Sequence, residues 1–363
     1  MKEKISIYQF FILMTMIPYG TASLFFLAPE AKQDVWIALL LYALPGILLQ
    51  IVYITLYDKY PKDTLVTYMP KIYGKFIGNI LSIIYITFFS YISIRVFRDL
   101  LELTASFALR HTSKLIFGLV FMIPIIYAVY TGIENISSLI QFYFIILLTI
   151  KLGSFFLILL SSDDMFKLQN LKPVLDNGIL NVLKNSWQLI TFPYGETIVF
   201  TMLYPFVLQK NKIKKAAILS IMVDALLLSF NSIVFICTLG VDFATLSNFP
   251  LFETYRLMHI GDFLSRLDIL FMILFLVEGF FKLSIFLYTA VLGASQVFNL
   301  KQNRFLFIPF IVLILSLLLE KNYPQHINIG LNYVPKYISL PLEIVLPTLT
   351  LIIFYTKNSI LKK

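Results

Sequence analysis

Two short motifs place proline, tyrosine and glycine next to each other inside apolar stretches of this sequence. They are Pro-Tyr-Gly-Thr at residues 18–21 and Pro-Tyr-Gly-Glu at residues 193–196. Proline lacks the backbone N–H that a helix needs, and glycine makes non-helical backbone angles inexpensive. A helix that opens at such a motif presents N–H groups to an anion, such as a carboxylate, and carbonyl oxygens to a cation. The motifs therefore predict a ligand site, although two incidental kinks remain an alternative.

Ionisable side chains inside the apolar stretches are the next candidates, because each is costly in lipid unless it is paired. Glu196 lies within the second motif. Glu278 and Lys282 have the i, i+4 spacing that favours an ion pair on one helix, with contact to a ligand as the alternative. Both are candidate ion- or proton-coupling groups, as is Lys151. Lys151 has no charged neighbour in the sequence, so it is either an ion- or proton-coupling group or a structural group with a distant partner.

Arg95 follows Tyr91 by one helical turn, so both side chains point in the same direction. In one interpretation they face a cavity, where Arg95 meets Glu196 or the carboxylate of a ligand. In the other, Arg95 together with Arg98 and Asp99 marks the headgroup boundary of a long tilted helix. The sequence leaves both interpretations open.

No arrangement of residues typical of an enzyme is present. The three histidines are dispersed, and the single cysteine, Cys237, lies within an apolar run. The sequence has no metal-binding spacing, no nucleophile elbow and no phosphate-binding loop. We expect no catalytic activity and no cofactor. The net charge of +9 resides largely in short loops, where it sets membrane topology, so we expect no nucleic-acid partner.

The elements that position these residues are transmembrane helices. The chain of 363 residues is 59% hydrophobic and only 13% charged, and its mean hydropathy is +0.85. A crossing needs about 20 apolar residues, and continuous apolar runs indicate helices rather than strands. We therefore expect an all-α integral membrane protein, surrounded by lipid, with about ten transmembrane helices. The expected spans are residues 6–28, 35–57, 72–105, 115–131, 135–160, 179–208, 214–240, 265–299, 303–320 and 337–357.

The two motifs fall in the first and sixth of these spans, which cross the membrane in opposite senses. Matching interruptions in two halves indicate an inverted repeat with a binding site near the membrane midplane. We expect a single transmembrane domain over residues 1–363, with one repeat at about 6–160, a second at about 179–299, and extra helices at 303–320 and 337–357. The basic cluster at residues 210–215 places both termini on the cytoplasmic side.

A distinctive run, PLFETYRLMHIGDFLSRLD at residues 250–268, accompanies the Phe-Pro-Tyr-Gly-Glu motif at 192–196. With these two features, essentially the whole chain resembles the B subunits of bacterial spore germinant receptors, which are permease-like relatives of the amino acid–polyamine–organocation transporters. The resemblance implies a 5+5 inverted repeat of the leucine-transporter type with broken helices 1 and 6, in the inner membrane of the spore. It also implies a small-molecule germinant, with the A and C subunits of the receptor as partners.

By this resemblance the ligand pocket is lined from the first, third and sixth spans by Tyr19, Gly20, Thr21, Tyr91, Arg95, Phe192, Tyr194, Gly195 and Glu196. Lys151 resembles a lysine that some proton-coupled relatives carry on the fifth span. The first motif is bulkier than in many amino-acid carriers, so the nutrient is an amino acid or a sugar. The implied function is germinant sensing that triggers germination with partner subunits; the alternative is a proton-coupled secondary amino-acid permease that titrates Glu196 or Lys151.

Overall fold

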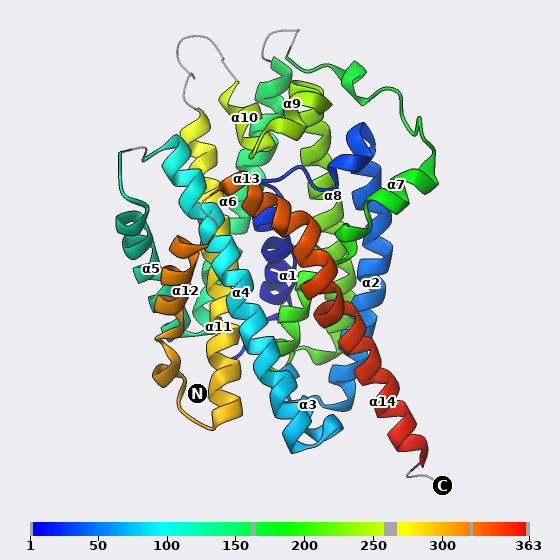
Figure 1. Ribbon diagram of the computed structural model, residues 1–363, viewed down its shortest axis with the longest axis vertical. Coiled ribbons are helices and arrows are strands. Elements are labelled where there is room, and N and C mark those ends of the chain that lie inside the picture. Colours follow the sequence, from blue (N-terminus) through cyan, green and yellow to red (C-terminus); the bar gives the residue numbers. More distant parts are fainter. Residues whose placement is uncertain (1–2, 110, 161–164, 258–266, 320–321, 361–363) are drawn as a thin grey trace.

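Every regular element that the computed structural model describes is helical, apart from one isolated bridge between Ile5 and Val207 (Figure 1). The structure describes all residues except 1–2, 110, 161–164, 258–266, 320–321 and 361–363. The α-helices are α1 (Ile7–Ala22), α2 (Val35–Lys59), α3 (Leu65–Tyr73), α4 (Lys75–Phe107), α5 (Lys114–Thr131), α6 (Ile133–Leu160), α7 (Ile179–Asn185), α8 (Ile213–Leu239), α9 (Val241–Leu246), α10 (Pro250–Arg256), α11 (Leu267–Phe298), α12 (Ile308–Leu318), α13 (Tyr323–Asn328) and α14 (Leu346–Ile360).

Shorter helical turns of other kinds join these α-helices. The 3-10 helices are η1 (Pro29–Asp34), η2 (Leu168–Leu171), η3 (Trp187–Ile190), η4 (Gly195–Met202), η5 (Tyr204–Phe206), η6 (Lys210–Lys212) and η7 (Gln302–Phe305). The π-helices are η8 (Ile329–Tyr333) and η9 (Pro335–Val345). Of the distinctive run at 250–268, residues 250–256 form α10, whereas residues 258–266 lie outside the described part of the chain.

Seven helical stretches within the described residues are long and apolar enough to cross a membrane. They are Pro29–Lys59, Lys75–Phe107, Lys114–Thr131, Ile133–Phe156, Lys210–Leu239, Asp268–Phe298 and Tyr323–Lys357. The protein is thus an all-helical, multi-pass membrane protein. The expected number of about ten spans is met in part, because the segments at 6–28, 179–208 and 303–320 contain only shorter helices.

The first span differs from the prediction. Residues 18–21 are not an interruption, because they form the last turns of α1, which ends at Ala22. One proline removes a single intrahelical hydrogen bond, and the helix continues through it. The chain leaves the helix one turn later, where the Ser23 hydroxyl donates to the Gly20 carbonyl at 2.7 Å. The predicted span at 6–28 is therefore wrong over its last six residues, 23–28, and the 16 residues of α1 extend only about 24 Å.

The sixth segment is interrupted at the second motif. Residues 191–194 form turns between η3 and η4, and no α-helix covers residues 186–208. The N–H groups of Gly195 and Glu196 both donate to the Thr191 carbonyl, at 2.8 and 3.1 Å. The eight residues of η4 are long for a 3-10 helix, which usually runs for three or four residues. This geometry places Glu196 in the first turn of η4.

The last crossing is longer than predicted. Helix begins at Tyr323 and continues to Ile360, so residues 323–336 are not the loop that the expected span at 337–357 implied. Polar residues lower the mean hydropathy of this stretch, so a hydropathy profile does not indicate a membrane-spanning helix there. Pro335 and Pro341 cannot donate to the preceding turn, and the wider π-turns of η8 and η9 accompany them.

The packing places α1 in the middle of the bundle, against α6, α8 and α11 (Figure 1). Both chain ends lie at the same end of the bundle in Figure 1. There the N-terminal segment is fixed by Ile5, whose N–H donates to the Phe206 carbonyl at 3.0 Å and whose carbonyl accepts from the Leu208 N–H at 3.0 Å. The single-domain boundaries, the inverted repeat and its leucine-transporter type remain predictions.

Candidate ligand-binding site

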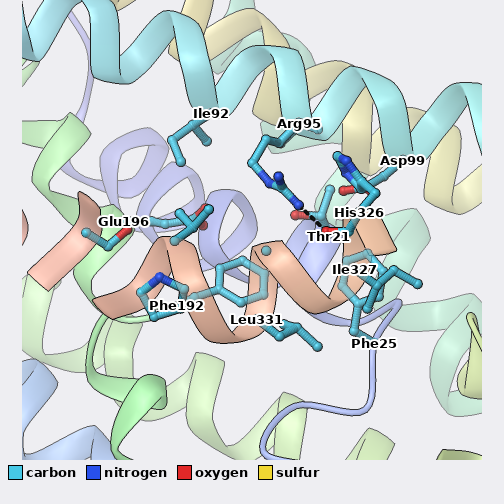
Figure 2. Close-up of a pocket in the computed structure, with 15 residues that line it drawn as sticks. Thr21, Phe25, Ile92, Arg95, Asp99, Phe192, Glu196, His326, Ile327 and Leu331 are labelled. Carbon is cyan, nitrogen blue, oxygen red and sulfur yellow. Dashed lines mark hydrogen bonds and ion pairs between the residues drawn. The ribbon is translucent and has the colours of Figure 1, made fainter. Parts of the chain in front are cut away.

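A cavity of about 60 Å³ lies where α4, the interrupted sixth segment and the last crossing meet (Figure 2). Its walls are mostly apolar, and charged side chains reach it from α4 and from η4. The lining residues are Thr21, Phe25, Ile92, Arg95, Val96, Asp99, Phe192, Glu196, His326, Ile327, Gly330, Leu331, Val334, Pro335 and Ser339.

Arg95 reaches the cavity from α4 and is only 7% exposed. Its guanidinium donates to the backbone carbonyl of His326, and Nη1 lies 3.4 Å from the Tyr91 hydroxyl. Figure 2 shows the arginine pointing from α4 toward the helix that carries His326. Gly330 makes room for it, because a methyl group at that position would lie 2.4 Å from Arg95 Nη2. Arg95 is therefore a buried part of the cavity wall.

Asp99 lies one turn beyond Arg95 and is held by the same crossing. Its Oδ1 accepts from the Tyr323 hydroxyl at 3.0 Å and lies 3.2 Å from His326 Nε2. All three side chains are buried. These contacts join the start of the last crossing to α4. They therefore position the part of that crossing, including Gly330, that forms a wall of the cavity.

Glu196 forms the opposite end of the cavity from Asp99 in Figure 2. Its Oε2 lies 2.6 Å from Lys282 Nζ of α11, and the lysine also donates to the Thr21 hydroxyl at 2.8 Å. Lys282 is fully buried and Glu196 is 5% exposed. One lysine thus ties the end of α1 to the first turn of η4. The predicted contact between Arg95 and Glu196 is replaced by these separate partners.

A second buried ion pair lies beside α1, outside the cavity lining. Lys151 Nζ is 3.6 Å from Glu278 Oε1 and also contacts the Tyr19 hydroxyl. The tyrosine accepts from Asn231 at 2.7 Å, and Ser23 Oγ lies 3.3 Å from Glu278 Oε2. Lys151 therefore has a partner far away in the sequence, on a different helix.

The predicted ion pair between Glu278 and Lys282 is wrong. The two side chains point to different neighbours, Glu278 to Lys151 and Lys282 to Glu196. Each residue meets a buried opposite charge on another element. Glu278 and Lys282 are one turn apart on α11, and this separation lets the first reach α6 and the second reach η4. Tertiary packing therefore decides the pairing, because a desolvated partner outweighs an i, i+4 contact worth only a few tenths of a kcal/mol.

Four of the residues expected at the ligand site line the cavity, namely Thr21, Arg95, Phe192 and Glu196. The other five do not line it. Tyr91 contacts Arg95, Tyr19 contacts Lys151, and Gly20 packs against the backbone of Glu278. The Tyr194 hydroxyl donates to the Leu39 carbonyl at 2.6 Å, and Gly195 abuts Glu343. The interrupted segment thus contributes one aromatic ring and one carboxylate to the cavity.

Sequence reasoning missed the wall that the last crossing supplies, from His326 to Ser339. One signal was present in the sequence. Gly330 lies among larger residues in a stretch with Pro335 and Pro341, and glycine and proline together indicate an irregular helix with a close approach.

A smaller cavity of about 10 Å³ adjoins the first and shares Phe192, Leu331 and Pro335 with it. Its other lining residues include Glu30 and Asn332, both exposed. Phe192 and Leu331 therefore separate the larger cavity from the end of the bundle that carries η1 and α7 (Figure 1).

The arrangement is suited to a small polar molecule. Arg95 offers N–H donors, Glu196 and Asp99 offer acceptors, and Phe25 and Phe192 offer apolar surface. A few convergent polar groups in a mostly apolar cavity are typical of small-molecule sites. Among the described residues, no group of three or more His, Cys, Asp and Glu side chains could hold a metal ion.

Comparison with protein families gives a match over residues 4–326 to the family described as "Spore germination protein". Spore germination protein KB of Bacillus subtilis (strain 168) is 34% identical over 360 residues, covering 98% of this chain and 96% of that protein. Spore germination protein B2 of the same organism is 24% identical over 307 residues, covering 84% of this chain and 82% of that protein.

Comparison with solved structures gives a match to Mhp1, a nucleobase-cation-symport-1 family transporter in a closed conformation with bromovinylhydantoin bound. The match has a TM-score of 0.46 and 12% sequence identity, and it covers 96% of this chain and 75% of that chain.

Proposed function

The chain belongs to the spore germination protein family, and from that premise we propose that it is the germinant-sensing subunit of a spore germination receptor. In this proposal a small nutrient binds in the cavity between α4, the interrupted sixth segment and the last crossing. The observation that carries the proposal is the cavity itself, with Arg95 and Glu196 both facing it from different elements. Binding of a small molecule in such a cavity requires no catalytic group.

The ligand is an amino acid or a sugar. Arg95 would accept a carboxylate or hydroxyl oxygens, and Glu196 or Asp99 would accept an ammonium group or hydroxyl donors. Phe25 and Phe192 would cover the remaining apolar surface of the nutrient. This set of groups fits a molecule of few heavy atoms with polar groups at both ends.

The signal would pass through the interrupted segment. A ligand shifts a conformational equilibrium only through different affinities for the two states. Glu196 lies at once on the cavity wall and in the first turn of η4, and it is bound to Lys282 of α11. A nutrient that competes for Glu196 would therefore move η4 against α11, and the A and C subunits of the receptor would respond to that movement.

The location follows from the family and the topology. We place the protein in the inner membrane of the bacterial spore, with both termini on the cytoplasmic side. The basic residues at 210–215 and both chain ends lie at the same end of the bundle in Figure 1, in agreement with the excess of lysine expected on that side.

A proton-coupled secondary amino-acid permease is the second candidate function. The observation that favours it is the buried pair of Lys151 and Glu278, since intramembrane ionisable residues often form proton relays. In that case the same cavity would carry a substrate across the membrane instead of sensing it.

Proteoliposomes containing the purified protein distinguish the two functions. Counterflow of radiolabelled amino acids and sugars is measured together with equilibrium binding of the same compounds. Saturable binding without counterflow supports the sensor, and saturable counterflow supports the permease. Loss of binding in Glu196→Gln, with the protein still in the membrane, ties the result to this cavity, whereas unchanged binding removes the cavity from the account.

A further inference from the structure

Glu343 is a fully buried carboxyl group that the ligand site does not use. It lies in η9, is 0% exposed, and neither carboxyl oxygen has a hydrogen-bond partner among the described residues. Ionisable groups in such surroundings are rare and costly within a membrane protein, and they mark functional sites by default.

The backbone that carries Glu343 is fixed in place. The Tyr53 hydroxyl of α2 donates to the Glu343 carbonyl at 2.5 Å, and the Tyr85 hydroxyl of α4 donates to the Leu342 carbonyl at 2.8 Å. Both tyrosines are buried. Two different helices therefore hold this turn, so the carboxyl group cannot withdraw by a shift of its own backbone.

The side chain is aimed at the interruption in the sixth segment. A methyl group at position 195 would lie 2.3 Å from Glu343 Oε2, so the carboxyl group occupies space that exists only because residue 195 is glycine. The same position is closed on its other side by the Ile190 carbonyl, 3.0 Å from such a methyl group. Glu343 thus packs directly against the start of η4.

The charges around Glu343 do not balance. The facing groups are Glu196 of η4, Lys282 of α11, Tyr53 of α2 and Tyr85 of α4, with the Ser339 hydroxyl nearby on η9 itself. Lys282 is the only cation in this set, and it already binds Glu196 at 2.6 Å. Asp224 of α8 is 0% exposed and interacts electrostatically with Lys282 as well. It is therefore a third buried carboxyl group that shares this lysine.

One lysine cannot neutralise three buried carboxylates, and each uncompensated charge costs several kcal/mol in the interior. A proton on a carboxylate removes that charge without any further partner. We propose that Glu343 is a proton-binding site, occupied in this conformation, and that the neutral acid allows η4 to pack against the last crossing. The step is the reversible addition of one proton from water to the carboxylate.

Loss of this proton would place a negative charge against Gly195 and beside Glu196, so it would push the interrupted segment away from η9. Proton binding at Glu343 and the position of η4 are therefore linked. This inference does not depend on the proposed nutrient, because it concerns the protein without a ligand.

Infrared difference spectroscopy of the purified protein in lipid tests the proposal. The carbonyl stretch of a protonated carboxylic acid is recorded at neutral pH, well above the ordinary carboxyl pKa of about 4. We expect the band to lose intensity in Glu343→Gln, and the control Glu134→Gln, at an exposed position, to leave it unchanged. An identical band in the wild-type protein and Glu343→Gln would overturn the proposal.

Folding of the variant is informative as well. Glutamine reproduces the shape and neutrality of the protonated acid, so Glu343→Gln should accumulate and unfold thermally much like the wild-type protein. Loss of the folded protein in Glu343→Gln together with a folded Glu343→Asp would show that a carboxylate is required, and it would contradict a protonated Glu343.

Discussion

Lys282 Nζ lies 2.6 Å from Glu196 Oε2 and 2.8 Å from Thr21 Oγ1, so one buried lysine joins α11 to both motif-bearing segments. The side chain of Lys282 is fully buried, and that of Glu196 nearly so. In the protein interior each of these two charged side chains needs the other, because either one alone would be an uncompensated charge. The interrupted sixth segment and the end of α1 are therefore positioned by the same group.

Lys282→Met should destabilise the protein by about 3–5 kcal/mol, because it leaves Glu196 ionised and without its cation. The double variant Lys282→Met/Glu196→Gln should recover much of this loss, since neither charge remains. Thermal unfolding of the purified protein in detergent measures both, with Lys184→Met as an exposed control. Equal destabilisation of the single and double variants would show that the pair is not coupled.

Lys151→Met should disturb function and stability more than Lys32→Met. Lys151 is 8% exposed and pairs with Glu278, whereas Lys32 is exposed on η1. Removing the buried lysine leaves Glu278 as an unpaired charge, at a cost of about 3–5 kcal/mol. Protein yield, thermal unfolding and the germination response of spores are compared. Equal tolerance of both substitutions would make the buried pair dispensable.

Gly330→Ala should weaken the nutrient response without unfolding the protein. The added methyl group would lie 2.4 Å from Arg95 Nη2, so the guanidinium must move away from its position in the cavity. We expect the half-maximal nutrient concentration to rise by about tenfold, equivalent to ~1.4 kcal/mol of binding. Gly153→Ala is the control, because nothing lies within 4 Å of a methyl group there. A wild-type dose response in Gly330→Ala would remove Arg95 from the site.

Glu3→Ala should loosen the beginning of α6. Glu3 Oε2 accepts from the Ile133 N–H at 3.1 Å and from the Tyr288 hydroxyl at 2.6 Å. Hydrogen bonds to a charged group contribute about 1.5–3 kcal/mol each, and a carboxylate at a helix N-terminus is further stabilised by the helix dipole. Hydrogen exchange of the first turn of α6 should speed up. Glu134→Ala, in the same turn, also removes a carboxylate that favours the helix dipole but none of these hydrogen bonds, so it should speed up exchange less. Equal exchange in both variants would contradict the capping role.

The sequence was sufficient to predict helical membrane spans, because continuous apolar runs have one solution in lipid. It also located the interruption at 193–196, where proline and glycine coincide beside a buried carboxylate. The same composition at 18–21 gave the wrong result, since the chain tolerates Pro18 inside α1 and leaves the helix only after Ala22. The local pattern alone does not distinguish a kink from a break.

The pairing of buried charges could not be predicted from spacing. Glu278 and Lys282 satisfy the helical rule, yet their partners are Lys151 and Glu196, whose proximity depends on how α11, α6 and η4 pack. The wall formed by residues 326–339 was missed for a related reason. Its polar residues resemble a loop in a hydropathy profile, yet His326, which contacts Asp99, and Ser339 are buried by tertiary packing.

The central claim is that the nutrient is sensed in the cavity beside Arg95, and a filled cavity tests it most directly. Ile92→Phe adds bulk to the cavity wall, while Ile83→Phe makes the same change at an exposed position of the same helix. The germination dose response of spores containing equal amounts of each variant is measured against amino acids and sugars. We predict a rise of about tenfold or more in the half-maximal concentration for Ile92→Phe alone, ~1.4 kcal/mol. A wild-type response in Ile92→Phe spores would contradict the account.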